Sequence, residues 1–556
     1  MLKICKITNK EFEITEKDLE FYEKMWVPVP TLCPEERQKR RLSWQNMYNL
    51  YHVECRATGK KIISSFADSS KYNVFDMEYW WSDKWDFKNY WIDFDYGKKF
   101  FEQYDNLLKT TPLPALFTNY ENDVNSDYTN YAWYDKNCYL IFHADENEDC
   151  CFATGLKRSK KCFDSLNVFD WEQNYECIDC QSCFNLQYSQ DCNKCSDSYF
   201  LRNCEWCSFC FGSINQINQK YVLFNKQVTE EEYKKFISDF DSWKRHIIDL
   251  VREKFSNLEK KSIHKNIYWK NNEKCEWDHI FNCKEVLESF DVKESRNMKF
   301  CERIYNWPNA DCYDVDQFGL RVTRMYETIN TWVDCNNVRF SWYSYNLINC
   351  DYVMFGFNLE DCFACIWLKN QKYCIFNKQY SKEEYFELKE KIIEHMKSSP
   401  QPYPEWGEFF PSEISPYWYN ESIAQEYFPL TEKEILNLWF NYKKEQEQVI
   451  YNWAKIEVEN DISDINTDIL KKILTCKNCD KNYRLVEPEY NFYKEKSIPV
   501  PLSCPSCRHL ERTKKRNPRK LFDRKCDKCS CEIKSTFDKN REEVIYCEEC
   551  FERKVY

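Results

Sequence analysis

Residues 177–210 read CIDCQSCFNLQYSQDCNKCSDSYFLRNCEWCSFC, and this cysteine-rich stretch decides the fold. A charged or amide residue followed by cysteine recurs through the stretch and ahead of it, at Cys138, Cys150, Cys162, Cys177, Cys192 and Cys204. Recurrences this short are typical of a solenoid of short strands and turns, in which equivalent side chains stack in columns. Because cysteine is small and apolar, it suits the narrow interior of such a repeat.

The thiols of residues 177–210 also have CxxC spacing, which is typical of metal ligands. However, the earlier recurrences at Cys138, Cys150 and Cys162 have no second cysteine three positions on. A stacked column of reduced thiols explains the whole pattern better than two further metal sites. Metal binding, as part of a redox or Fe–S protein, is the alternative.

A second, looser block has cysteines at Cys283, Cys312, Cys335, Cys350 and Cys362. Each block ends in related text, FNKQVTEEEY at 224–233 and FNKQYSKEEY at 376–385. Both copies carry the spacing of a capping box, Thr or Ser followed three positions later by Glu. We therefore expect helices over about 229–260 and 381–397, and a third over 431–449 opened by Thr431. The Pro- and aromatic-rich residues 398–430 are expected to form an extended cover that packs on the body.

Eight cysteines near the C-terminus form two sets of paired CxxC motifs. The sets are Cys476, Cys479, Cys504 and Cys507, and Cys526, Cys529, Cys547 and Cys550. Four thiolates on two turns are the tetrahedral ligand set of structural zinc, with Fe–S as the main competitor. We therefore expect two zinc ions per chain. A closed four-cysteine site leaves no open position for water, which argues against metal catalysis. Cys531 is expected to be a bystander.

The two ends of the chain are copies of one module. At a constant offset of 471, residues 5–66 match 476–537 with 19 identities over 62 positions. The N-terminal copy keeps Cys5, Cys33 and Cys55, but Thr8, Glu36, Thr58, Asp76 and Tyr79 stand where the other copy has cysteine. We expect this degenerate copy to keep the same path without metal.

A basic strip separates the two cysteine sets. Residues 504–525 carry nine Lys or Arg and two Asp or Glu in a chain whose formal net charge is −12. A basic strip on a small rigid module is typical of phosphate recognition. The candidate nucleic-acid-binding residues are Arg508, Arg512, Lys514, Lys515, Arg516, Arg519 and Lys520. Docking of the strip on the protein's own acidic body, and a simply solvated helix face, are the alternatives.

Composition places the chain among large, polar, multidomain proteins. It has 556 residues and a mean hydropathy of −0.77, and no apolar run approaches the ~20 residues of a membrane helix. The N-terminus has no apolar signal segment, so 33 cysteines favour a reducing, cytoplasmic setting. Phosphate-loop, serine-hydrolase, HExxH and dinucleotide motifs are missing from the sequence, so we expect no enzyme.

The expected architecture is a multidomain α+β protein with Cys-rich, β-solenoid-like repeats and capping helices between zinc-ribbon modules. The expected segments follow the chain in five parts: a degenerate zinc-ribbon-like module at 1–85, repeat blocks with helices at 86–262 and 263–397, a Pro- and aromatic-rich linker and helix at 398–475, and a double zinc ribbon at 476–556.

Glycine and tryptophan have unusual frequencies. The chain has 7 glycines and 20 tryptophans, and Trp206, Trp277, Trp307 and Trp418 stand in turn-like contexts that favour glycine. One hypothesis is that some of these codons are read as glycine in the source cell. The alternative is an aromatic core rich in tryptophan.

The Cys-rich repeat and the paired CxxC motifs together resemble one group of bacterial proteins with Cys-rich repeats and a C-terminal pair of zinc ribbons. The matching text is CFACIWLKNQKYCIFNKQY at 362–380 and, at the end, CPSCRH at 504–509, RNPRK at 516–520 and YCEEC at 546–550. The group typically has glycine where this chain has Trp26, Trp367 and Trp418. The resemblance implies zinc ribbons and a cytoplasmic location, and it implies no activity.

The expected function is that of a non-catalytic zinc protein whose C-terminal module binds nucleic acid, RNA rather than DNA, with ribosomal RNA as a candidate. The first alternative is a structural, scaffold or self-assembling protein that presents the repeats to protein partners. The second is a redox or Fe–S protein. No membrane partner is expected, and the sequence leaves the oligomeric state open.

Overall fold

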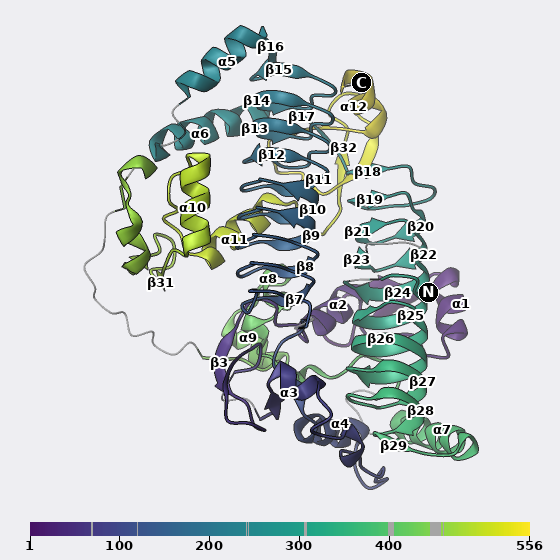
Figure 1. The fold of residues 1–556 in the computed structure, drawn as a ribbon. Helices are drawn as coiled ribbons and strands as arrows, with labels where there is room; N and C mark the ends of the chain where they lie inside the picture. The colour runs from purple at the N-terminus through teal and green to yellow at the C-terminus, as the bar shows by residue number, and fades with distance from the viewer. Residues whose placement is uncertain are drawn as a thin grey trace. The chain divides into compact units, whose positions relative to one another are not determined.

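The computed structural model describes residues 1–67, 71–118, 121–240, 242, 244–304, 309–317, 319–398, 405–444, 458–459 and 461–555. The chain is a mixed α/β protein with many parallel strands (Figure 1). By contacts it divides into two compact units. Unit 1 is Met1–Ala115 with Ile267–Lys444, and unit 2 is Leu116–Asn266 with Glu445–Tyr556. Each unit therefore combines segments far apart in the sequence, and the five-segment division made from the sequence stays a prediction.

Unit 2 contains a stack of parallel strands, here called the first stack. Neighbouring strands pair at a repeating register, as in Thr154 with Leu166 and Leu166 with Ile178. The number of residues between paired positions equals the spacing of Cys138, Cys150 and Cys162. The last strand turns back and pairs antiparallel. The strands are β7 (Asn130–Trp133), β8 (Phe142–Asp145), β9 (Thr154–Lys160), β10 (Leu166–Glu172), β11 (Ile178–Gln181), β12 (Phe184–Gln187), β13 (Ser196–Arg202), β14 (Ser208–Ile214), β15 (Lys220–Leu223) and β16 (Lys226–Gln227) (Figure 1).

The backbone conformation of the first stack repeats every three residues. Every third residue from Tyr131 to Phe224 has a positive φ, and the residue after it tends to be buried in the core of the stack. In Asn203-Cys204, for example, Asn203 has φ 50° and Cys204 is fully buried. Asn and Asp tolerate this left-handed conformation best. This explains the charged or amide residue that precedes each recurring cysteine in the sequence.

Many of the inward side chains are cysteine or serine, which also bond to backbone. The Cys150 thiol donates to the carbonyl oxygen of Glu148 at 3.3 Å, and its sulfur accepts the backbone N–H of Cys162 at 3.4 Å. Ser189 plays the same part in another layer. Its hydroxyl donates to the carbonyl oxygen of Gln187 and accepts the backbone N–H of Leu201 at 3.1 Å. A buried N–H without a partner is costly. Cysteine and serine therefore satisfy the backbone of the next layer while filling little space.

Unit 1 contains the second stack, whose register is less regular. Arg296 pairs with Ala310, Ala310 with Thr323, and Tyr345 with Phe357, so the offset along the chain differs among these three parallel pairs. This variation accounts for the looser cysteine spacing. The strands are β18 (Trp269–Lys270), β19 (Ile280–Phe281), β20 (Lys284–Leu287), β21 (Phe290–Lys293), β22 (Ser295–Lys299), β23 (Glu302–Ile304), β24 (Asn309–Asp316), β25 (Thr323–Trp332), β26 (Asn336–Met354), β27 (Phe357–Phe363), β28 (Lys369–Ile375) and β29 (Lys378–Gln379).

Helices follow both stacks, as the capping boxes predict. Thr229 and Thr431 cap their helices with both reciprocal hydrogen bonds, and Ser381 exchanges the same bonds with Glu384. The helix expected over 229–260 is instead two helices, α5 (Glu230–Asp239) and α6 (Arg245–Lys261). The second is α7 (Lys382–Ser398). The third, α9 (Glu432–Asn437), is shorter than expected, and residues 445–449 lie outside the described residues.

The N-terminal and C-terminal modules have the same elements at the offset of 471, which confirms the repeat. The N-terminal module contains β1 (Leu2–Ile4), β2 (Glu11–Glu13), α1 (Glu16–Lys24), α2 (Pro34–Leu42), β3 (Tyr51–Glu54), β4 (Lys61–Ser64), β5 (Val74–Phe75) and α3 (Met77–Trp81). The C-terminal module contains β30 (Leu474–Thr475), β31 (Asn482–Tyr483), α10 (Glu487–Lys496), α11 (Pro505–Lys515), β32 (Phe522–Lys525), β33 (Glu532–Ser535), β34 (Val544–Tyr546) and α12 (Glu548–Val555). Both β5 and β34 pair in parallel with a strand from outside the module, β6 (Leu113–Pro114) and β17 (Ile263–Lys265).

The Pro- and aromatic-rich segment packs on unit 1, as its composition predicts. Trp406, Phe409 and Phe410 are buried, and Phe410 contacts Tyr104 of α4 (Phe100–Thr110) at 5.2 Å between ring centroids. The segment continues through short turns into α8 (Ile423–Tyr427). Among the described residues, every helix is too short or too polar to cross a membrane.

Candidate metal centres and docking of the modules

The first candidate metal centre lies in the C-terminal module, where the sulfurs of Cys476, Cys479, Cys504 and Cys507 all lie within 4.8 Å of one another. Cys476 and Cys479 come from the turn between β30 and β31. Cys504 caps the N-terminus of α11, and Cys507 lies in its first turn. The four predicted ligands of this set therefore converge from two turns, and the group can hold a metal ion.

Backbone groups favour the thiolate form at this centre. Burial opposes ionisation of Cys476, but the N–H groups of Cys504 and Asn478 point at its sulfur at 3.2 and 3.4 Å. Together with a further N–H from Cys479 they lower its pKa to about 7. Since metals bind thiolates and not thiols, the donor set fits a soft divalent cation.

The second candidate centre differs from the expected ligand set. The sulfurs that lie within 4.8 Å of one another are those of Cys526, Cys529, Cys547 and Cys531. Cys531, expected to be a bystander, thus has its sulfur among the candidate ligands, and its carbonyl oxygen accepts the N–H of Cys526 in the turn that carries Cys529. Cys550 faces the sulfurs of Cys526, Cys529 and Cys547 from α12. Five thiols thus surround one metal position, with Cys531 and Cys550 alternatives for the fourth ligand.

The N-terminal module keeps the backbone of these centres without the ligands. The turn at Cys5 has the bonds of its C-terminal counterpart: its N–H donates to Lys10 and its carbonyl accepts from Asn9. Glu36, which replaces Cys507, is buried and paired with Lys39 at 2.5 Å. Within the described part of this module, three or more such ligand atoms are nowhere gathered as closely as in the C-terminal copy.

The basic strip docks on the first stack through its first two arginines. Arg508 and Arg512, on α11, are 5% and 3% exposed. Arg512 reaches Asp164 at 2.8 Å, and Arg508 lies 3.2 Å from Asp164 and 2.8 Å from Glu489. Next to them Phe492 stacks on Phe163 at 4.0 Å between ring centroids. These two arginines are therefore part of a buried intramolecular contact and face away from solvent.

The N-terminal module docks on the second stack with the equivalent residues. Arg37 and Arg41, the counterparts of Arg508 and Arg512, are 1% and 0% exposed. Both bond to Asp314, at 2.8 and 3.1 Å, and Arg41 also reaches Asp316 at 2.6 Å. Phe21 stacks on Tyr313 at 3.8 Å, as Phe492 does on Phe163. The two arginines are identical in both copies although the ligands differ, and this was the signal in the sequence that could have identified the docking face.

The remaining residues of the strip are less engaged. Arg516 pairs with Asp179 at 2.6 Å and is largely buried. Lys514, Lys515 and Lys520 are exposed, and Arg519 is half-buried. Lys514 and Lys515 line a cavity of about 670 Å³ in unit 2. Its other charged walls are Arg202, Arg252, Lys260 and Arg541 and the carboxylates Glu176, Glu259, Glu511 and Glu543.

Two interior cysteines of the first stack, Cys177 and Cys180, have the features of packed thiols. Burial raises the pKa of Cys177 and of Cys180 to about 12, so both are protonated at neutral pH. Within the described residues, the groups of ligand atoms gathered within 4.8 Å of one another do not include them. A stacked column of reduced thiols fits this geometry.

Comparison with known proteins gives this chain no family. Neither the models of protein families nor the curated proteins match it. One solved structure that is similar in part is described as a putative acetyltransferase from Desulfovibrio desulfuricans G20, with 8% identity and a TM-score of 0.12. The match covers 44% of this chain and 63% of that one, and at this TM-score it carries no argument. The resemblance to bacterial proteins with double zinc ribbons stays a prediction.

Proposed function

We propose that the protein is a non-catalytic, zinc-stabilised scaffold built on two β-solenoids, each held by a ribbon module. The zinc ribbon at the C-terminus clamps the first solenoid, and the metal-free N-terminal ribbon clamps the second. The observation that carries the proposal is the pair of buried arginines in each module, which bond to aspartates of the stack. Residues that suggest phosphate binding in the sequence thus serve internal docking, and the stacks supply the surfaces for partners.

The role of zinc in this proposal is structural. Each zinc orders the turns that hold its ligands, and much of the folding free energy of small zinc modules comes from the metal. Cys504 begins α11, and Arg508 and Arg512 lie one and two turns further along the same helix. Removal of zinc should therefore loosen the helix that carries both docking arginines.

Hydrogen exchange on the full chain, with and without a zinc chelator, tests the clamp. Chelation should raise exchange in α11 and in β9 and β10, whose layer supplies Asp164. The strands β24 to β26 of unit 1 are the internal control and should not change, since their module lacks the sulfur ligands. Equal protection of α11 with and without metal would contradict the proposal.

Nucleic-acid binding is the second candidate function, and the cation-lined cavity beside Lys514 and Lys515 favours it. Phosphate contacts of these exposed lysines would add to affinity without reading sequence. Binding to a short single-stranded RNA should then weaken with salt, with a slope of about −0.7 per contact. Changing Lys514, Lys515 and Lys520 to Glu should abolish it with both zinc ions retained. RNA affinity that is unchanged in this variant would remove the candidate.

A further inference from the structure

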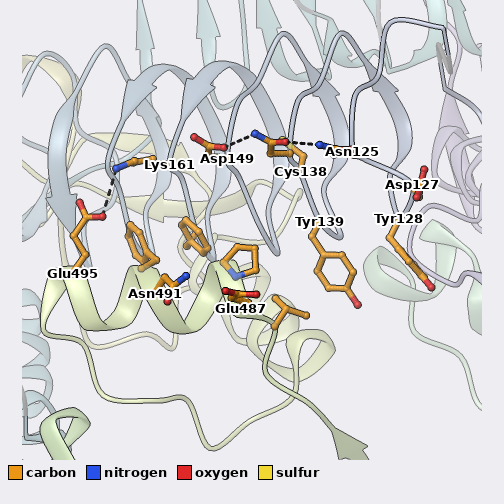
Figure 2. A pocket seen from close by; sticks show the side chains of 15 residues that line it. Asn125, Asp127, Tyr128, Cys138, Tyr139, Asp149, Lys161, Glu487, Asn491 and Glu495 are labelled. Carbon is orange, nitrogen blue, oxygen red and sulfur yellow. Dashed lines mark hydrogen bonds and ion pairs between the residues drawn. The ribbon is translucent and has the colours of Figure 1, made fainter. Parts of the chain in front are cut away.

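A second cavity in unit 2, of about 710 Å³, lies between the first stack and α10. Figure 2 shows Tyr128 and Tyr139 projecting from the stack toward the helix, with Glu487 and Asn491 on the helix side. The two tyrosine rings are 5.3 Å apart between centroids. The volume is within the range of about 300–1,000 Å³ that is usual for ligand sites.

The charge of this groove is negative. Its walls carry the carboxylates of Asp127, Asp149, Glu487 and Glu495 and the single ammonium of Lys161. Lys161 pairs with Glu495 at 3.5 Å at one end (Figure 2). Asp127 and Glu487 are exposed and make no ion pair or hydrogen bond with another residue that the structure describes. Two carboxylates are therefore available to a cation beside the rings of Tyr128 and Tyr139, and aromatic rings also attract cations.

The N-terminal module has a lysine at the position of one residue that lines the groove. Pro488, which lines the groove, is the counterpart of Lys17 at the offset of 471. Lys17 extends from α1 to the second stack and pairs with Glu285 at 2.6 Å. The N-terminal module thus supplies a lysine to its own stack, whereas the C-terminal module has a proline and leaves the groove open.

We infer that this groove is a docking site for a basic peptide segment of a partner protein, whose Lys or Arg side chain takes the place that Lys17 holds in unit 1. The cation would lie between Asp127 and Glu487 against the tyrosine rings. Asn491 has a free amide on the helix side, within the described residues, and can bond to the peptide backbone. The inference names a partner for the scaffold and so rests on the proposed function.

Fluorescence anisotropy on the full chain tests the inference, with a labelled Lys-Gly-Lys-Gly-Lys peptide as the probe. The Asp127→Asn, Glu487→Gln double variant should weaken binding about three- to tenfold, because exposed ion pairs and cation–π contacts are each modest. Both residues are exposed, so folding should be unaffected. Glu253→Gln, an exposed change on α6 outside the groove, is the matched control and should bind as the unchanged protein does.

Pro488→Lys is the sharper variant, because it should fill the groove as Lys17 does in unit 1. We expect about a tenfold loss of peptide binding, with Pro488→Ala unchanged. Equal affinity for the Lys and Ala variants, or for a Glu-Gly-Glu-Gly-Glu probe, would overturn the inference. Stronger binding of spermine than of the peptide would overturn the assignment to a peptide. Hydrogen exchange of α11 in the same samples separates this result from failure of the zinc clamp.

Discussion

Replacing Asp164 by Asn should undock the C-terminal module, because this aspartate joins the module to the first stack. Its side chain is fully buried, 2.8 Å from Arg512, and 3.2 Å from both Arg508 and the hydroxyl of Tyr493. Removing one partner of a buried ion pair typically costs about 3–5 kcal/mol, since the other charge stays buried. Glu489 still neutralises Arg508 in the variant, so we expect the lower end, about 3 kcal/mol.

Hydrogen exchange measures this cost as the free energy of local opening. Exchange in α11 should speed up by roughly a hundredfold or more, at about 1.4 kcal/mol for each factor of ten. Asp170→Asn is the matched control in the same stack: its pair with Arg158 is exposed, and such pairs are worth less than about 1 kcal/mol. If the two variants show the same small change, the buried pair does not hold the module and the reasoning fails. Asp314→Asn should have the corresponding effect on α2 of unit 1.

Three further predictions address the metal, an interior carboxylate and a tryptophan. Cys504→Ser should lower the zinc content from two to one per chain by elemental analysis, and an unchanged content would show that Cys504 is not a ligand. Burial raises the pKa of Asp135 to about 8 against the N–H groups of Asn147, so its proton stabilises the native state at low pH and this stability is lost as pH rises toward 8. Unit 2 should therefore gain ~1–2 kcal/mol between pH 8 and pH 6. Asp135→Asn should reduce the slope of the profile from urea unfolding, and the part due to Asp123, whose pKa burial raises to about 7, should remain. Trp26→Gly should stabilise unit 1 by about 1 kcal/mol in thermal unfolding, because Trp26 has φ 55° and is 83% exposed; a loss of stability would refute this.

The recoding hypothesis depends on where each tryptophan lies. Trp206 and Trp367 have positive φ, but so does every third residue of the stack around Trp206, so their geometry decides nothing. Trp26 and Trp439 lie outside the stacks, each just after the last turn of a helix, where glycine is the preferred residue. Trp418 has φ −83° and does not need glycine, and Trp307 lies outside the described residues. The coding DNA at Trp26 and Trp439 is the direct check.

Local patterns in the sequence predicted the local structure well. The recurring cysteines and the CxxC pairs are only a few residues apart in the sequence. The distances between their side chains therefore follow from the local backbone geometry. The capping boxes at Thr229 and Ser381 are equally local. The break between α5 and α6 was missed because residues 240–244 carry no proline or glycine to mark it.

Pairing over long distances was beyond the sequence. Asp164 and Arg512 are 348 residues apart. Arg512 is repeated as Arg41 in the N-terminal copy, but a single sequence does not show that its partner is Asp164. For the basic strip, phosphate binding was the preferred explanation, with self-docking and solvation as alternatives, because charge alone does not identify the partner. Cys531 was set aside because its spacing from Cys529 does not fit a CxxC pair, whereas the structure places its sulfur within the group of candidate ligands.

Unit 2 combines two segments that are far apart in the sequence, and this has a consequence during synthesis of the chain. The first stack is complete when residue 227 has been made. Phe163 is covered by α10 and Phe152 by α11, and α11 ends only at residue 515. At typical rates of about 5–20 residues per second, the gap of roughly 290 residues leaves this aromatic surface uncovered for about 15–60 s. The nascent chain therefore spends much of its synthesis with an open apolar face, and molecular chaperones that bind such faces on the ribosome should be needed for its yield in cells.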